Sequence, residues 1–551
     1  MAKRSRSTAR RSRETVANAS SGNESAEKTV TPSDGDPSLR HDAAWLGGSV
    51  LLTVLVLWSG VPLGIPGEWV WPTRPASFLI AGNLVVPVAV VGLYLAAVEA
   101  MVFAVRSAAV PRAIPLLGLV CAGTVVSIGV QSGVGGVSGL MRSTFLLFDD
   151  RASGYFTESR PFVDDLAGFL DGYEDTVAEG EYLHQGTHPP GLITGYILLD
   201  KLVRSVPALQ SFSEAIRSPE AVDAAEVLAA YPEGPGPQPY AVLHLFALAT
   251  VAMCAAAVVP IWLLLGPTLT DEAAFRVAAL WPLLPSLIVF APKSDLLLPI
   301  FPLTVAVLWR TAVTTAPSVA ACARAAAAGL VAGAGLCISL AVLPTYAAVA
   351  IGGVAASRGL RPGWKPVAAL VASGAGGVAV WIAGFGLAGA NLLAIWSGNL
   401  ANHARFYDYN PRTDWAWLAV NPVEASLAVT LPLVVFAAVH WRQVRPRPDP
   451  ATTSVEDASR RATRFIAFGV LIAWAMTWLS GKNMGEAARL WIVFDPWVVL
   501  VAGLAIGPSL TPGRWRLLAI AIGIASVATV LRVDGFGMVE QLSASPIAPT
   551  G

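Results

Sequence analysis

Two adjacent carboxylates, Asp149 and Asp150, follow an apolar stretch directly and precede Arg151 and Tyr155. A carboxylate beside another one has a raised proton affinity, and desolvation at a membrane boundary acts in the same direction. Either aspartate therefore suits a general base that takes a proton from a hydroxyl, with Tyr155 as a substrate-binding candidate. The pair also suits a divalent cation, Mg²⁺ or Mn²⁺, and two adjacent aspartates do not decide this point. The alternative is that Asp149 and Asp150 have no chemical role and only begin a solvated loop.

The most distinctive string in the chain is HQGTHPPG, at residues 184–191. Two prolines fix its backbone, and a glycine permits the close approach of another part of the chain. We interpret His184 and His188 as substrate-binding or scaffolding residues of an active site. A rigid turn with exposed histidines is the alternative, and a metal site would lack a convincing third ligand.

Charged residues also occur between later apolar segments. Lys293 and Asp295 lie in a hairpin where a charge pair is expensive unless it has a function or caps a helix. His403 and Arg405 lie in a loop rich in aromatic residues. Aromatic belts at membrane interfaces explain the tryptophans and tyrosines of that loop but not the histidine and the arginine. We predict that His403 and Arg405 contact phosphate or sugar.

The segment 482–489 has the sequence KNMGEAAR and precedes another apolar stretch. Glu486 and Arg489 stand three residues apart and share one helix face, so one interpretation is an internal ion pair that stabilises the helix end. The other is that Lys482 or Arg489 holds a lipid-linked phosphate. Arginine suits that role because its guanidinium is always charged and binds phosphate in a bidentate manner.

The chain that must position these residues is strongly apolar. Of its 551 residues, 54% are hydrophobic and 13% are charged, whereas soluble domains carry about 25% charged residues. The formal net charge is zero, so we expect no nucleic-acid partner. The four cysteines lie in apolar stretches without CxxC spacing, and we interpret them as packing residues.

A helix needs about 20 apolar residues to cross a bilayer. Eleven such windows are visible, and a further apolar region at 325–357, interrupted at Pro344, predicts a tight pair of helices. We therefore predict an all-α polytopic membrane protein with about thirteen transmembrane helices. The eleven windows are residues 44–62, 77–104, 113–132, 239–266, 277–291, 296–311, 366–386, 421–441, 464–480, 488–507 and 516–533.

The distribution of basic residues predicts the orientation of these helices, because loops rich in Arg and Lys stay on the cytoplasmic side. The rule puts the N-terminus and five basic loops inside, which leaves residues 133–238 and the loops near 292–295, 387–420 and 481–489 outside. The basic loops contain Arg106 and Arg112, Arg310 and Arg324, Arg358 to Lys365, Arg442 to Arg461, and Arg514 and Arg516.

The loop at 133–238 carries 16 acidic and 6 basic side chains, which is tolerable outside the cell but not in a cytoplasmic loop. Its apolar residues 190–199 are too few to span, so we predict a helix that lies along the membrane. The chain then divides into a disordered cytoplasmic tail, three transmembrane helices, the external loop, the remaining helices and an external tail. These regions are residues 1–43, 44–132, 133–238, 239–533 and 534–551.

Taken together, these motifs resemble those of the GT-C membrane glycosyltransferases, most closely the protein O-mannosyltransferase and aminoarabinose-transferase branch. The resemblance covers residues 113–532 and rests on the Asp149-Asp150 pair, the HPPG turn, the Lys293-Ser294-Asp295 hairpin and the segment GEAARLW. It implies a GT-C-like bundle whose large external loop bears interfacial helices and a catalytic aspartate, and a polyprenyl-phosphate sugar donor. Two helices, instead of the family's usual one, precede the helix that leads into the aspartate loop.

The loop also lacks the Asp-Glu pair of those branches, so the acceptor, whether lipid, glycan or protein, stays open. The resemblance implies that Asp150 or Asp149 deprotonates an acceptor hydroxyl, which displaces the lipid phosphate with inversion. The cations that stabilise this phosphate would come from Lys293, Arg405, Lys482 and Arg489.

The main alternative to a glycosyltransferase is a transporter or lipid flippase, which should have a polar midplane. Here the ionisable residues crowd the external boundary and no internal repeat is visible. A non-catalytic membrane scaffold or sensor is the third possibility.

Overall fold

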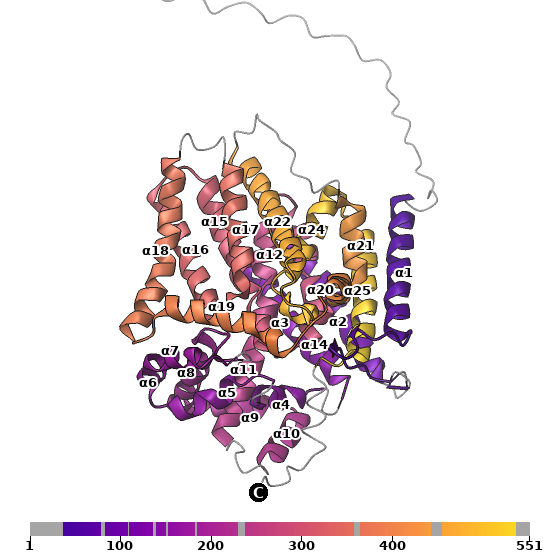
Figure 1. Ribbon diagram of the computed structural model, residues 1–551. Coiled ribbons are helices and arrows are strands. Elements are labelled where there is room, and N and C mark those ends of the chain that lie inside the picture. Colours follow the sequence, from indigo (N-terminus) through magenta and orange to yellow (C-terminus); the bar gives the residue numbers. More distant parts are fainter. Residues whose placement is uncertain are drawn as a thin grey trace, which may run out of the picture.

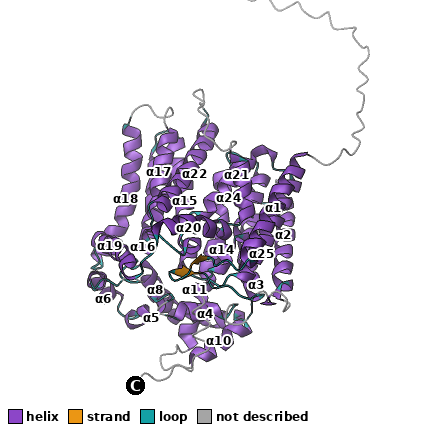
Figure 2. Cartoon of the chain, turned by 45° about the vertical axis from the view of Figure 1, so that its right-hand side comes forward, coloured by secondary structure: helices purple, strands orange, loops and turns teal. Residues whose placement is uncertain are grey.

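The computed structural model describes residues 37–75, 77–78, 83–107, 109–135, 139–149, 152–181, 184–229, 237–357, 364–441 and 454–535. Asp150, Arg151 and most of the two predicted tails lie outside the described residues. The described chain is almost entirely helical. Long helices lie side by side, and a group of short helices gathers at one end of them (Figures 1 and 2).

Ten segments of the described chain are long and apolar enough to cross a membrane, so the protein is a multi-pass integral membrane protein. An eleventh crossing results if α20 (Asp414–Ala428) and α21 (Leu431–Val439), which meet at 99°, are counted together. Helix length alone does not confirm the predicted count of thirteen. The ten segments are built by α1 (Pro37–Trp58), α2 (Val85–Arg106), α3 (Ala113–Ser132), α11 and α12 (Pro237–Ala256 and Val258–Leu265), η5 and α15 (Ser294–Leu297 and Ile300–Thr314), α16 (Val319–Ile338), η6 and α17 (Leu340–Val342 and Leu343–Ser357), α18 (Lys365–Leu387), α22 (Val455–Leu479) and α25 (Pro512–Arg532).

One predicted crossing, at residues 277–291, is not a single helix. Pro282 and Pro285 interrupt it, because proline lacks the backbone donor of a helix interior and clashes with the preceding turn. The backbone of this segment is nevertheless buried inside the bundle, which is where a membrane protein tolerates irregular structure. The segment is divided among α13 (Asp271–Ala278), η4 (Trp281–Leu283) and α14 (Pro285–Val289).

The predicted crossing at residues 488–507 is also divided. It consists of the short α23 (Ala487–Leu490), a turn, and the 12-residue α24 (Asp495–Ile506), all of whose residues are buried, followed by η8 (Gly507–Ser509). Helix α24 is too short to span on its own, since a crossing needs about 20 residues.

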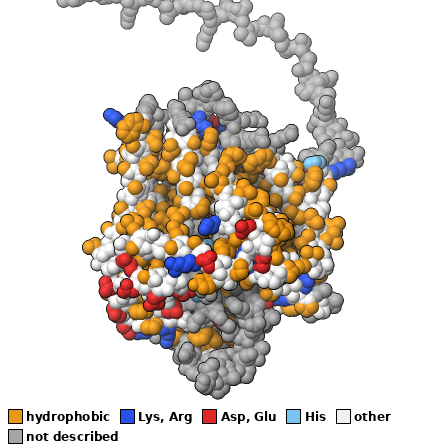
Figure 3. Space-filling model, viewed as in Figure 1, with side chains coloured by type: hydrophobic (Ala, Val, Ile, Leu, Met, Phe, Trp, Pro, Cys, Tyr) orange, Lys and Arg blue, Asp and Glu red, His pale blue; other side chains and the backbone are white. Residues whose placement is uncertain are grey.

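Short helices between residues 142 and 229 form a layer at one end of the long helices (Figure 1). The helix expected along the membrane at 190–199 is α8, whose 15 residues are too few to span. It buries Ile193 and Ile197 and leaves Leu198 and Leu202 about half exposed. Acidic side chains gather over α6 and α7 (Figure 3). The layer contains α4 (Arg142–Phe148), α5 (Tyr155–Ser159), η3 (Arg160–Phe162), α6 (Leu166–Asp171), α7 (Tyr173–Ala178), α8 (Gly191–Ser205), α9 (Pro207–Ile216) and α10 (Pro219–Ala229).

Helix α19 (Leu392–Tyr409) runs across the ends of the long helices and faces the short-helix layer (Figure 1). A two-stranded antiparallel hairpin, β1 (Gly64–Ile65) and β2 (Trp69–Val70), lies against the start of α20. Its turn residue Glu68 accepts hydrogen bonds from the Thr413 backbone at 3.0 Å and from the Trp417 indole at 2.7 Å. These bonds fix the first turn of α20.

The opposite end of the bundle is closed by ion pairs. Arg276 forms a bidentate pair with Glu99 at 2.9 Å, and Arg516 reaches the same carboxylate at 2.8 Å. Arg106 pairs with Glu272 at 2.7 Å. The contacts tie α2, α13 and α25 together at the end where the basic residues of the sequence accumulate.

Small residues let α16 and α18 approach each other closely. A Cβ atom on Gly377 would lie 2.2 Å from the Ala326 carbonyl oxygen, whereas one on the adjacent Gly376 would meet nothing within 4 Å.

We expect Gly377→Ala to lower the thermal unfolding midpoint in detergent, because the backbones of α16 and α18 must separate. The matched Gly376→Ala should leave the midpoint unchanged or raise it, since alanine favours a helix over glycine by up to about 1 kcal/mol. Equal midpoints for the two variants would contradict this account of the contact.

Candidate functional site

Residues from four distant segments meet where the short helices join the long ones. The Asp295 carboxylate acts electrostatically on Tyr155, His188, Lys293 and Arg489. Lys293 is also within electrostatic range of two further carboxylates. We call this group the polar cluster; its members are Asp149, Tyr155, His188, Lys293, Asp295, Glu486 and Arg489.

Asp149 ends α4 and is 8% exposed. Its Oδ1 accepts a hydrogen bond from the Ala152 backbone at 2.8 Å, and its carbonyl accepts one from Ser153 at 2.9 Å, so the aspartate holds the turn between α4 and α5. Gly154, with a φ of 67°, completes the turn, and Tyr155 follows as the first residue of α5. Asp150, the other predicted base, lies outside the described residues.

Tyr155 contacts both histidines of the HQGTHPPG string. Its ring centroid lies 5.5 Å from that of His184 and 5.7 Å from that of His188, with both pairs edge to face. Burial raises the pKa of the Tyr155 phenol well above its usual value and lowers the pKa of His188 to about 4. Both groups are therefore neutral at pH 7, and His188 can form hydrogen bonds but carries no charge for a phosphate.

The loop before α8 is held by hydrogen bonds to its own backbone. The Glu181 carboxylate accepts from the N–H groups of His184 at 2.7 Å and Gly186 at 3.0 Å. The Tyr173 hydroxyl donates to the His188 carbonyl at 2.9 Å. These bonds fix the turn that presents the two histidines.

Helix α19 holds the same loop from the other side. Asn399 and Asn402, one helical turn apart, donate from their side-chain amides to the Gly186 carbonyl at 2.8 and 2.9 Å. Both asparagines are almost fully buried. Sequence reasoning missed Asn399. The sequence does contain one indication: Asn399 and Asn402 stand three residues apart in a segment of mixed polarity, so their side chains share one face of a helix.

Lys293 and Asp295 flank the start of η5, between α14 and α15. Lys293 is 5% exposed, and its ammonium donates to the Ala152 carbonyl. Burial and the nearby Arg489 lower the pKa of Lys293 to about 8, although the neighbouring carboxylates act in the opposite direction. Asp295 Oδ2 is buried and has no hydrogen-bond partner among the described residues.

Arg489 donates to the Glu486 carboxylate at 3.0 Å, as one interpretation of the sequence predicted. Its Nε is buried and lacks a hydrogen-bond partner within the described chain. Asn483 and Glu486 have φ values of 60° and 54°, and a non-glycine residue in this conformation costs about 1–3 kcal/mol. The segment that carries Arg489 is therefore strained, and its surroundings must hold it in place.

Of three further predicted residues, one lies beside the polar cluster and two lie at the surface. Burial lowers the pKa of His403, and the nearby Lys482 acts in the same direction. His403 is also within electrostatic range of His188. Lys482 and Arg405 are exposed, and an Arg405 nitrogen lies close to Gly180. The structure thus brings His403 to the cluster and leaves Lys482 and Arg405 at the surface.

Among the residues that the structure describes, no group of three or more His, Cys, Asp or Glu side chains is arranged to hold a metal ion. The four cysteines are unpaired, and Cys254 and Cys337 are buried.

In comparisons with known proteins, no protein-family model and no curated protein matches this chain. The chemistry of the site must therefore be argued from its geometry. The polar cluster combines carboxylates that can accept a proton, two cations that can stabilise an anion, and a neutral imidazole. Asp295 Oδ2 and Arg489 Nε supply a buried acceptor and a buried donor without partners in the described chain, as expected of groups that bind a polar ligand.

Tyr173→Phe should loosen the loop that carries His188. The change removes the hydroxyl that donates to the His188 carbonyl, and an unsatisfied buried acceptor costs about 1–3 kcal/mol. We expect faster amide hydrogen exchange in residues 184–188 and a lower unfolding midpoint. Tyr409→Phe is the matched control, because Tyr409 is 63% exposed. Unchanged exchange in the Tyr173 variant would show that this hydrogen bond does not hold the loop.

Proposed function

We propose that this protein is a membrane glycosyltransferase that transfers a sugar from a polyprenyl-phosphate donor to an acceptor hydroxyl on the non-cytoplasmic side, with inversion. The observation that carries the proposal is the polar cluster, in which Asp149 and Asp295 lie within electrostatic range of the buried Lys293. Arg489 acts on Lys293 as well. A proton acceptor beside two cations, at the membrane boundary, suits transfer from a lipid phosphate to a hydroxyl.

Contacts at the two ends of the bundle support the thirteen crossings and the GT-C-like arrangement. Asp271 pairs with Arg112 at 2.9 Å at one end, whereas Lys293 contacts Ala152 at the other. Residues 271–293 therefore run the full depth of the bundle in pieces.

The segment from Arg489 to Arg514 also has contacts at both ends of the bundle. Arg489 belongs to the polar cluster, and Arg514 pairs with Asp42 near the start of α1, at 2.6 Å. Beside the ten long segments and the bent pair, we propose these two broken segments as the twelfth and thirteenth crossings. Because Arg106 and Arg112 lie at the end opposite to the polar cluster, the positive-inside rule favours an external site.

In the proposed reaction, Asp149 or Asp150 accepts the proton of the acceptor hydroxyl as its oxygen attacks the anomeric carbon of the donor sugar. A new C–O bond forms on one face while the bond to the phosphate oxygen breaks on the other, so the configuration inverts. The phosphate leaves with the bonding electron pair. Lys293 and Arg489 stabilise the charge that develops on it, which lowers the barrier. The sugar and the acceptor class stay open.

Asp149→Asn and Asp150→Asn test the base. Loss of a general base costs about 10²–10⁴-fold in rate, so we expect one of the two variants to lose transfer from a polyprenyl-phosphate sugar by that factor. Asp223→Asn, at an exposed position on α10, is the control and should keep full activity. Full activity in both test variants would remove the proposed base. Substrate movement across vesicles without any glycosidic product would favour the transporter.

The pKa of Lys293 predicts an alkaline limit to activity. With a value of about 8, the lysine is cationic at pH 7 and loses its charge as the pH rises through 8. We expect kcat/KM for the donor to fall over that range. Lys293→Arg should move the fall to higher pH, because a guanidinium stays protonated. If kcat/KM falls over the same alkaline pH range in wild-type protein and in the Lys293→Arg variant, Lys293 is not the titrating cation.

A further inference from the structure

Helix α20 packs against the strained segment 483–488, which leads to Arg489, and forms hydrogen bonds with it. Asn421 donates from its side-chain amide to the Asn483 carbonyl at 3.2 Å and accepts from the Gly485 N–H at 3.4 Å. One turn further along the same helix, Glu424 lies against the backbone N–H groups of residues 487 and 488. Asn421 and Glu424 are 2% and 3% exposed. They share one helix face, and that face points at residues 483–488.

Glu424 is an unusual residue for this place, because a carboxylate buried in a membrane protein costs free energy unless donors surround it. Neither of its oxygens makes a hydrogen bond of normal geometry within the described chain. The nearest donors are the Trp71 indole and the backbone N–H groups of Ala487 and Ala488. The two backbone donors open α23, and Ala488 lines the same small cavity as Glu424. Glu424 therefore lies against the turn that carries Arg489.

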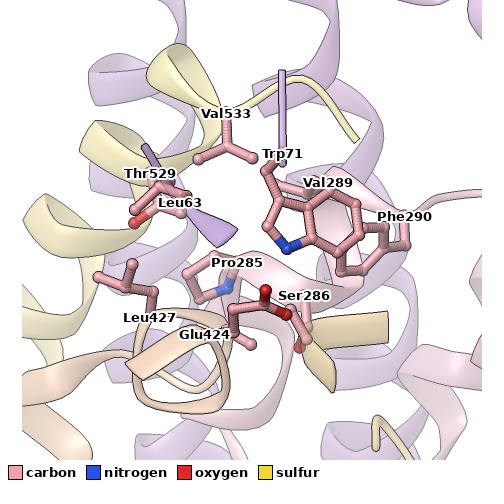
Figure 4. Close-up of a pocket in the computed structure, with 12 residues that line it drawn as sticks. Leu63, Trp71, Pro285, Ser286, Val289, Phe290, Glu424, Leu427, Thr529 and Val533 are labelled. Atoms are coloured by element: carbon pink, nitrogen blue, oxygen red, sulfur yellow. The ribbon is translucent and has the colours of Figure 1, made fainter. Parts of the chain in front are cut away.

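No residue of the polar cluster lines the space beside Glu424. A cavity of about 30 Å³ lies there, lined by Trp71, Ser286, Phe290 and Ala488 among others (Figure 4). This volume holds a few water molecules at most. Glu424 thus acts on the polar cluster through the protein and not through a substrate.

We propose that Glu424 is a positioning residue that holds residues 487–488 and thereby sets the place of Arg489 against the donor phosphate. The role of Arg489 in this statement rests on the proposed function. The hold of Glu424 on the segment does not. Asn421 and Tyr407 support the preceding part of the segment, since the Tyr407 hydroxyl accepts from the Met484 N–H at 2.8 Å.

The first experiment measures the order of the segment without any enzyme assay. A spin label is placed at the exposed position 482 by Lys482→Cys, in a protein in which Cys121 and Cys322 are replaced by serine. We expect Glu424→Gln to make the label more mobile, because the amide replaces one of the two carboxyl oxygens with an NH₂ group, which cannot accept from the two N–H groups. Glu424→Asp keeps both acceptor oxygens and should restore part of the order. Glu456→Gln, at a 66% exposed position on α22, is the control.

The second experiment uses unlabelled protein and a double-mutant cycle on transfer from the polyprenyl-phosphate donor. We expect Glu424→Gln to lower kcat/KM about tenfold and Arg489→Ala to lower it at least 100-fold. Two residues that act through one another are not additive, so adding Glu424→Gln to Arg489→Ala should cause no further loss.

An unchanged label mobility in a folded Glu424→Gln variant would overturn the positioning role, whatever the activity. Additive losses in the cycle would also overturn it, because Glu424 would then act independently of Arg489. If wild-type protein transfers no sugar while the label responds as expected, the positioning contact stands and the proposed function fails.

Discussion

A charge that leaves water must find a partner, and this constraint organises the end of the protein where the short helices lie. Lys293 is almost fully buried, and its electrostatic neighbours are Asp149, Asp295, Glu486 and Arg489. Removing one partner of a buried pair leaves an uncompensated charge, which typically costs about 3–5 kcal/mol. The short-helix layer, the hairpin between α14 and α15, and the segment before α24 therefore depend on one another. The polar cluster therefore connects these three parts of the fold, in addition to being a candidate site.

The chemistry gathers where helices are broken. The segment at 277–291 is divided by prolines and leads to Lys293, and residues 483–486 include three positive φ angles before Arg489. Lipid does not satisfy exposed backbone groups, so such segments survive only inside protein. Residues 277–291 are buried, and residues 483–486 are buried or half-buried. Because the helices are broken at these places, the chain can change direction there and point Lys293 and Arg489 into the polar cluster.

One helix connects the two halves of the site. From α19, Asn399 and Asn402 hold Gly186 in the histidine loop, and Tyr407 holds Met484 in the segment before Arg489. Because α19 is a rigid rod of 18 residues that crosses the ends of the long helices, it sets the separation of these two loops. Both loops depend on hydrogen bonds to α19 that neither loop provides for itself.

The sequence alone determined the class of the protein, most of the membrane segments and the non-spanning α8, because hydrophobic length and amphipathic pattern are local properties. It also named every member of the polar cluster as a candidate site residue, from short strings of unusual residues. Only the tertiary structure decided which of these residues meet, that Arg405 and Lys482 stay at the surface, and that Asn399, Asn421 and Glu424 support the site. The physical reason is that a buried contact between residues hundreds of positions apart depends on how the helices pack, and no local pattern in the chain records that packing.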